Sequence, residues 1–385
     1  MKDHFAIIFT EKRMSMKSCY IHIPFCKTIC SYCDFCKFYY NKKWILKYLE
    51  QLQKEINLNY KGEKLSTIYI GGGTPTSLDY DELKYLLDIV KELKLNDNYE
   101  YTIEANVETL DLDKIKLLKA YGINRVSIGV ESIVEKNIKF LERHHAKEDV
   151  VKVINLLKQE GINNINIDLI YALPHQSIDD LKVDLDFFLS LNIPHISTYS
   201  LMIEPHTKLY INHEQNIDET LDLDMYNYIC QILKDNGYTH YEISNFAKNN
   251  FESKHNLTYW NNEEYYGFGV GASGYVNNIR YDNTRSINKY LDGEYRFSEE
   301  KIDFNTKVEN EFILGFRKLK GINKKDFYNK YKIDIDNLDV IKRLKLEEKL
   351  LEDKDNIFIN PQYIYTSNQI LVEFLGGNYE QRRSI

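Results

Sequence analysis

Residues 18–35 read SCYIHIPFCKTICSYCDF, and this stretch decides the fold that we expect. Its first part, Ser18 to Ile23, is short and mostly apolar and predicts a β-strand. A tight group of cysteines follows directly, so the strand is expected to lead into a cysteine-rich loop. Similar short strands recur along the chain and alternate with longer helical stretches, which makes residues 18–35 the opening of a repeated pattern.

The alternation predicts a parallel arrangement of strands. A repeated strand–helix–strand order gives a parallel sheet or barrel with right-handed crossovers. The strands are expected at residues 18–23, 67–70, 99–105, 125–130, 164–170 and 195–201, and the helices between them at 44–58, 83–93, 111–121, 147–160 and 178–191.

Three of these strands alternate apolar and polar residues instead of being apolar throughout. Ile103 precedes Glu104, Val126 precedes Ser127, and Ile167 precedes Asp168. Alternate residues of a strand point to opposite faces of a sheet. The apolar residues are therefore expected to pack under the helices, while the polar residues line an interior that holds a polar ligand.

The pattern changes after about residue 293. Helices are expected at 308–319, 324–331 and 341–351, with a small β wing at 356–364 followed by 369–375. We divide the chain into an N-terminal extension (1–17), a barrel domain with its C-terminal extension (18–295) and a small, mostly helical, winged-helix-like domain (296–385).

The composition excludes several classes of protein. A formal net charge of −8 argues against a nucleic-acid-binding surface. No apolar run approaches the length of a membrane span, and residues 1–17 lack the features of a secretory signal, so a cytoplasmic location is expected. Four of the six cysteines fall between Cys26 and Cys36. Such clustering in a long chain favours a metal or redox site over a disulfide scaffold.

Cys26, Cys30 and Cys33 form a C-x-x-x-C-x-x-C motif. Three thiolates from one loop can hold three irons of a 4Fe–4S cubane and leave the fourth iron open to a small molecule. Three alternatives stay open at this point, and one of them is a chance clustering of structural cysteines. A zinc site would take a fourth ligand from Cys36 or His22, and a ferredoxin-type cluster would take it from Cys36.

The residues around the cysteines carry a family resemblance. Residues 20–25 (YIHIPF), the three cysteines and residues 32–35 (YCDF) resemble the radical S-adenosylmethionine superfamily. Within it, the chain resembles the branch that contains oxygen-independent coproporphyrinogen III oxidase and the haem chaperone HemW. The resemblance covers about residues 19–375 and implies an α/β fold, a partial (β/α)6 TIM-like radical SAM barrel. It also implies that the open iron binds S-adenosylmethionine.

The resemblance implies a set of cofactor contacts as well. The glycine motif at 71–75 is expected to hold the methionine end of S-adenosylmethionine, and an inward-facing Glu104 suits its cationic sulfonium. Arg143 matches the arginine that binds the cofactor carboxylate. The expected cofactor-binding residues are Tyr20, Tyr32, Gly72, Gly73, Thr74, Glu104, Glu131, Arg143 and Asp168.

Glu131 departs from the family pattern. Residues 125–132 (RVSIGVES) resemble the motif R-x-S-x-G-x-Q-S, in which a glutamine stands at this position. Glutamine donates and accepts hydrogen bonds, whereas an ionised glutamate only accepts them. A ribose hydroxyl can still donate to Glu131, but the added negative charge puts the strength of cofactor binding in doubt.

Other features separate the two relatives. The oxidase pattern is C-x-x-x-C-x-x-C-x-C, but Phe35 stands at the position of its last cysteine. The oxidase also has a long amino-terminal arm, whereas only 25 residues precede Cys26 here. Residues 255–260 (HNLTYW) match H-N-x-x-Y-W, a mark of the chaperone branch. His255 is a candidate haem ligand, because a neutral imidazole is a usual axial ligand. Tyr259 and Trp260 are suited to pack on a flat macrocycle.

We therefore expect a haem chaperone with a 4Fe–4S cluster and an exchangeable S-adenosylmethionine, and we assign no catalytic residue. The expected partners are haem, a haem-acceptor protein such as a respiratory membrane protein, and a reductant such as flavodoxin or ferredoxin. Two enzyme alternatives remain. One is the oxidative decarboxylation of coproporphyrinogen III, and the other is a different radical S-adenosylmethionine reaction, such as methyl transfer.

Overall fold

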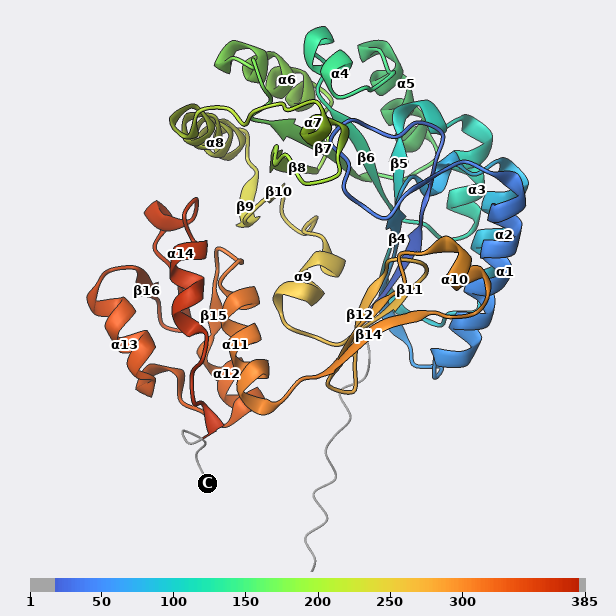
Figure 1. Cartoon of the computed structure of the whole chain (residues 1–385). Helices are drawn as coiled ribbons and strands as arrows, with labels where there is room; N and C mark the ends of the chain where they lie inside the picture. Colours follow the sequence, from blue (N-terminus) through green and yellow to red (C-terminus); the bar gives the residue numbers. More distant parts are fainter. Residues whose placement is uncertain (1–17, 381–385) are drawn as a thin grey trace, which may run out of the picture.

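Six parallel strands form the centre of the molecule (Figure 1). The computed structural model describes residues 18–380. The strands lie side by side in chain order, so the expected α/β fold with a parallel sheet is confirmed. They are β1 (Ser18–Ile23), β4 (Leu65–Gly72), β5 (Leu95–Asn106), β6 (Arg125–Glu131), β7 (Asn164–Tyr171) and β8 (His195–Ser200).

Helices on the outside of the sheet connect these strands (Figure 1). Most of them begin at the residue that the capping rules favour. The side chains of Asn41, Asp111 and Ser177 each accept a backbone N–H of the first helical turn, and Asp79 forms a capping box with Glu82. The connecting helices are α1 (Lys42–Asn59), α2 (Tyr80–Val90), α3 (Leu112–Ala120), α4 (Glu135–Phe140), α5 (Lys147–Gln159) and α6 (Ile178–Ser190).

The alternation along the strands places their side chains as expected. Ile103, Val126 and Ile167 are fully buried in the core between sheet and helices. On the other face, the Asn166 amide nitrogen donates to Ser127 Oγ and to Asp168 Oδ1, both at 2.8 Å. His195 joins this network at the start of β8. The polar faces of the strands therefore line a common interior.

The sheet continues beyond the six strands on both sides, which the sequence pattern did not predict. Beyond β8, β10 (Asn245–Ala247) and β9 (Thr239–Glu242) pair antiparallel. Beyond β1, β11 (Tyr265–Phe268) is parallel, and the next three strands are antiparallel. These are β12 (Ser273–Val276), β13 (Ile279–Asn283) and β14 (Arg296–Lys301). The helices of this region are α7 (Lys208–Ile211), α8 (Glu219–Asp235), α9 (Lys254–Trp260) and α10 (Ile287–Leu291).

The C-terminal part has a hydrophobic core of its own. Short helices pack on a three-stranded antiparallel sheet, as in a winged helix. The helix expected at 341–351 is shorter than predicted. It ends at Leu346, because Glu348 is left-handed (φ 56°) and Leu350 begins a strand. The elements are α11 (Phe304–Gly315), β15 (Ile322–Asn323), α12 (Lys324–Tyr331), α13 (Asp339–Leu346), β16 (Leu350–Glu352), β17 (Asn356–Ile359) and α14 (Asn368–Leu371).

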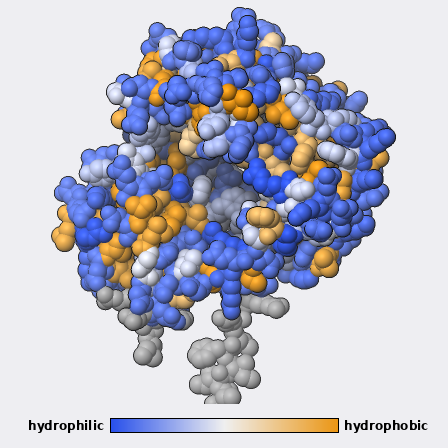
Figure 2. Space-filling model, in the orientation of Figure 1, coloured by the Kyte–Doolittle hydropathy of each residue, from blue (hydrophilic) through white to orange (hydrophobic). Residues whose placement is uncertain are grey.

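The C-terminal part packs against the end of the large sheet. Leu319 N–H donates to Tyr241 O at 3.1 Å, and Lys318 Nζ donates to Asn261 Oδ1 at 2.6 Å. Figure 2 shows a hollow in the molecular face between the barrel and this C-terminal part. The strand at the expected domain boundary, β14, pairs with β13 in the large sheet up to Lys301. The division at residues 295 and 296 stays a prediction.

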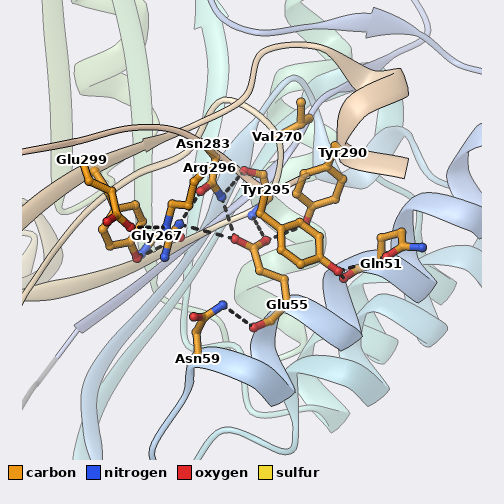
Figure 3. A network of polar contacts seen from close by, with 12 residues as sticks. Gln51, Glu55, Asn59, Gly267, Val270, Asn283, Tyr290, Tyr295, Arg296 and Glu299 are labelled. Atoms are coloured by element: carbon orange, nitrogen blue, oxygen red, sulfur yellow. Dashed lines mark hydrogen bonds and ion pairs between the residues drawn. The ribbon is translucent and has the colours of Figure 1, made fainter. Parts of the chain in front are cut away.

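A buried carboxylate of α1 forms hydrogen bonds with the segment that contains β11 to β14 (Figure 3). Glu55 of α1 is fully buried and accepts hydrogen bonds from Gly269 N–H (2.8 Å), Asn283 Nδ2 (2.7 Å) and Tyr290 OH (2.6 Å). Arg296 Nη1 lies 3.8 Å from Glu55 Oε1. Burial raises the pKa of Glu55, and these four partners oppose that effect. The network fixes the loop at residues 269–271.

Candidate cluster and cofactor site

The cysteine motif lies in a loop at the carboxyl end of β1. The loop joins β2 (Phe25–Cys26) to β3 (Phe38–Tyr39), and these two short strands pair in parallel. Tyr40 N–H donates to Cys26 O at 2.8 Å, which closes the base of the loop. Cys26 is buried, whereas Cys30 and Cys33 are half-buried.

Burial and neighbouring groups act on the sulfur atoms of the motif. Burial raises the pKa of Cys26 to about 12, although Thr74 Oγ1, 3.7 Å from its sulfur, lowers it. Burial also raises the pKa of Cys33. Arg143 Nη1 lies 3.4 Å from Cys30 Sγ and supplies a positive charge to that sulfur. Within residues 18–380, no three Cys, His, Asp or Glu side chains converge into a site for a single metal ion.

The glycine motif at the end of β4 packs against the cysteine loop without side chains. A Cβ atom on Gly73 would lie 2.9 Å from Cys26 Sγ and 2.8 Å from the Pro24 carbonyl carbon. A Cβ on Gly72, whose φ is +119°, would lie 2.7 Å from the His22 ring. Glycine is thus required here for the close approach of two loops. The same contacts leave the backbone at the end of β4 next to the cysteine sulfur.

Glu104 of β5 reaches the glycine motif from the barrel interior, as the strand alternation predicted. Its Oε2 accepts Gly72 N–H at 3.0 Å, and its Oε1 accepts Tyr69 OH at 2.8 Å. Burial raises the pKa of Glu104. Asp168 of β7 faces the same interior, and burial followed by the nearby Glu104 charge raises its pKa to about 6. A cationic ligand would relieve the repulsion between these two carboxylates.

Glu131, Arg143 and Tyr32 form a second group at the mouth. Tyr32 OH donates to Glu131 Oε1 at 2.8 Å, and Arg143 Nη2 lies 3.8 Å from Glu131 Oε2. Glu131 ends β6 in a left-handed conformation (φ 64°) beside a register shift, which turns its side chain toward Tyr32. Glu131 Oε2 and Arg143 Nε are buried without hydrogen-bond partners within residues 18–380. Unpaired buried polar atoms of this kind are suited to a polar ligand.

The two residues offered as fourth ligands are engaged elsewhere. His22 Nδ1 shares a hydrogen bond of 2.9 Å with Tyr20 OH, and His22 Nε2 shares one of 2.7 Å with the Cys36 carbonyl. Cys36 Sγ lies 3.7 Å from Arg285 O. A Cβ on Gly271 would lie 2.5 Å from Cys36 Cβ, so Cys36 packs against the loop that Glu55 holds.

His255 is held near the starts of two barrel strands. Its helix, α9, sits at the starts of β1 and β4, where Thr258 Oγ1 bonds Ser18 Oγ and His255 Nδ1 bonds Thr67 Oγ1 (2.8 and 2.7 Å). The second ring nitrogen bonds Tyr259 OH at 2.8 Å. Burial lowers the pKa of His255 to about 3. Both nitrogens of the expected haem ligand therefore have partners inside the protein.

A cavity of about 250 Å³ adjoins the cysteine loop and was not predicted from the sequence. Tyr20 and His22 form its floor. The remaining lining residues are Asp34, Phe35, Cys36, Tyr259, Tyr265, Gly271, Ser273 and Arg285. The resemblance of residues 255–260 to the chaperone branch was a signal for Tyr259, but no sequence pattern indicated Arg285.

Comparisons with known proteins agree with this architecture. The sequence profile of the Radical SAM superfamily matches residues 20–188. The chain is 41% identical over 369 residues to heme chaperone HemW of Lactococcus lactis, with 93% of this chain and 97% of that one aligned. Heme chaperone HemW of Bacillus subtilis is 37% identical over 378 residues, with 94% and 100% aligned.

Among solved structures, coproporphyrinogen III oxidase (HemN) from Escherichia coli, described as a radical SAM enzyme, superposes with a TM-score of 0.82. Its sequence is 20% identical, and the match covers 94% of this chain and 90% of that one. At this identity the likeness establishes the fold.

Proposed function

Because the chain belongs to the HemW family of radical SAM proteins, we propose that it is a haem chaperone that binds haem and transfers it to an acceptor protein. The observation that carries this proposal is the alignment with proteins named heme chaperone over nearly their whole length. The absence of a cysteine at position 35 agrees with it, because the oxidase pattern places one there.

The residues present fit a 4Fe–4S cluster with a small polar ligand. The cysteine loop offers three thiols, and Gly73 lets the end of β4 approach Cys26 closely. Glu131 Oε2 and Arg143 Nε are buried without hydrogen-bond partners in the described part of the chain. When bound, such a cluster supplies an electron and an open iron that chelates S-adenosylmethionine. Cys26, Cys30 and Cys33 would hold three irons, and Arg143 would shield the charge on Cys30.

We assign the remaining residues by their position around the mouth. The backbone of Gly72, Gly73 and Thr74 would bind the methionine end of the cofactor. Arg143 would hold the cofactor carboxylate. The other proposed contacts are Tyr20, Tyr32, Glu104, Glu131 and Asp168.

The partners follow from the proposed transfer. We propose a respiratory membrane protein as the haem acceptor, and flavodoxin or ferredoxin as the reductant of the cluster. We propose the cytoplasm as the location. Across residues 18–380, no helix combines the length and the apolar character that a membrane crossing requires.

One experiment separates the chaperone from the oxidase. The cluster is reconstituted anaerobically, and the protein is incubated in parallel with haem and with coproporphyrinogen III plus S-adenosylmethionine and a reductant. We expect a stoichiometric haem spectrum, transfer of haem to an apo-acceptor, and no protoporphyrinogen. Enzyme-like turnover of coproporphyrinogen III would contradict the proposal. The variant Cys30→Ala, which should lose the cluster, serves as the control for cluster-dependent steps.

A further inference from the structure

The cavity beside the cysteine loop has walls of two kinds. The cysteine loop contributes Asp34 and Phe35, while α9 and β11 contribute Tyr259 and Tyr265. Arg285, which follows β13, completes the rim. Segments distant in the sequence therefore meet at one opening.

The aromatic walls are positioned from inside the protein. The rings of Tyr259 and Tyr265 meet edge to face at 4.7 Å, and the Tyr259 hydroxyl is tied to His255 Nε2. Phe35 lines the same cavity and is 64% exposed. Exposed aromatic residues beside a cavity are typical of sites that bind flat apolar ligands.

The rim carries an available positive charge. Arg285 is exposed, and its Nη2 donates to the Asp34 carbonyl at 2.9 Å. That bond fixes the guanidinium over the cavity. Within the described part of the chain, the guanidinium makes no other hydrogen bond and no ion pair. Its remaining N–H groups can therefore bind a carboxylate.

We propose that this cavity is the haem-docking site. One edge of the macrocycle would enter between Phe35 and Tyr265, and a propionate would pair with Arg285. This inference rests on the proposed chaperone function. A cavity of about 250 Å³ is smaller than usual pockets for whole ligands, so the remainder of the ring would extend outside it. His255 is then a positioning residue, which holds Tyr259 in the wall.

The test compares haem with haem dimethyl ester, in which both propionates are esterified. Both ligands are titrated into the full-length, cluster-loaded protein and followed by absorbance. We expect Arg285→Gln to weaken haem binding about tenfold and to leave binding of the ester unchanged, because the ester offers no carboxylate. Arg343→Gln, at an exposed arginine of the C-terminal part, should change neither affinity.

The placement would be overturned if Arg285→Gln weakened the binding of haem and of its ester equally, or weakened neither. Iron and sulfide contents equal to wild type exclude an effect through the cysteine loop. Failure of the wild-type protein to bind haem would overturn the proposed function, and the placement with it.

A second variant tests the apolar wall independently. We expect Phe35→Ala to weaken haem and its ester alike, by about fivefold, because ring contact does not depend on the propionates. Phe297→Ala removes another exposed phenylalanine, on β14 outside the cavity, and should change nothing. Unaltered binding in Phe35→Ala would overturn the site as proposed.

Discussion

At the scale of single residues, Glu131 places a carboxylate beside the arginine that is proposed to hold the cofactor carboxylate. The two anions would compete for one guanidinium. We therefore expect Glu131→Gln to bind S-adenosylmethionine about three- to tenfold more tightly, since the amide frees the charge of Arg143 and can still accept from Tyr32. Anaerobic equilibrium dialysis measures this affinity. The control is Glu148→Gln, which removes the same charge from an exposed position on α5. Weaker binding of S-adenosylmethionine in Glu131→Gln would refute the competition.

The four clustered cysteines are expected to differ in their contribution to the cluster. Cys30→Ala should lose most of the iron after anaerobic reconstitution, because it removes one of three thiolates. Cys36→Ala should keep the wild-type iron and sulfide content, because its sulfur lies against Arg285 O and the loop at Gly271. Iron and acid-labile sulfide analysis measures both. Loss of iron in Cys36→Ala would instead favour a ferredoxin-type cluster.

Sequence alone indicated some of these positions and not others. The alternation in β5 placed Glu104 in the interior, because every second side chain of a strand faces the same way. The contact of Arg143 with Cys30 joins residues 113 positions apart in the sequence. The position of the Glu131 carboxylate depends on the left-handed backbone at that residue. Neither follows from a local pattern. The surroundings of His255 depend on Thr67 and Tyr259 and were likewise unpredictable.

At the scale of elements, the carboxyl end of β4 determines how closely the cysteine loop approaches the barrel. We expect Gly73→Ala to reduce cluster incorporation severalfold, because the new methyl group would lie 2.9 Å from Cys26 Sγ and 2.8 Å from backbone. Gly237→Ala is the comparison for backbone strain without crowding, since its φ is +80° and nothing lies within 4 Å of a Cβ there, and it should keep the wild-type cluster content. Iron content and far-ultraviolet circular dichroism separate loss of the cluster from loss of the fold. Full cluster occupancy in Gly73→Ala would contradict the steric argument.

The six central strands were predictable because each is a short, mostly apolar run between helical stretches, and three of them also alternate with period two. The strands at the sheet edges were not, because most of them are only three to five residues long. The three-residue strand β10, for example, is identified by its pairing with β8 and not by its composition. The same holds for α9, a helix of seven residues whose packing is set by the barrel base.

At the scale of the whole molecule, the junction between barrel and C-terminal part contains a buried carboxylate. Glu242 of β9 pairs in an isolated bridge with Lys318, and its side chain accepts a hydrogen bond from Asn245. Burial raises its pKa to about 7 from an ordinary value of 4.5. The folded protein therefore holds this proton to higher pH than the unfolded chain does, and stability is lost as the pH rises through about 7.

We expect Glu242→Gln to remove this pH dependence. Relative to the variant, the wild-type protein should lose up to about 3 kcal/mol of unfolding free energy between pH 5 and 8. Thermal unfolding at pH 5, 6, 7 and 8 measures the difference. The exposed Glu300→Gln on β14 should follow the wild type at every pH, and parallel profiles for all three proteins would refute the assignment.

The carboxylate of Glu55 also constrains when α1 can pack into the core while the chain is being synthesised. Its donors at Gly269, Asn283 and Tyr290 leave the ribosome more than 200 residues after α1, and Arg296 follows them. Until then the charge has no partners that compensate its burial. The first helix can therefore dock fully only late in translation, so a nascent chain that stalls before residue 269 should remain protease-sensitive at its amino-terminal helix.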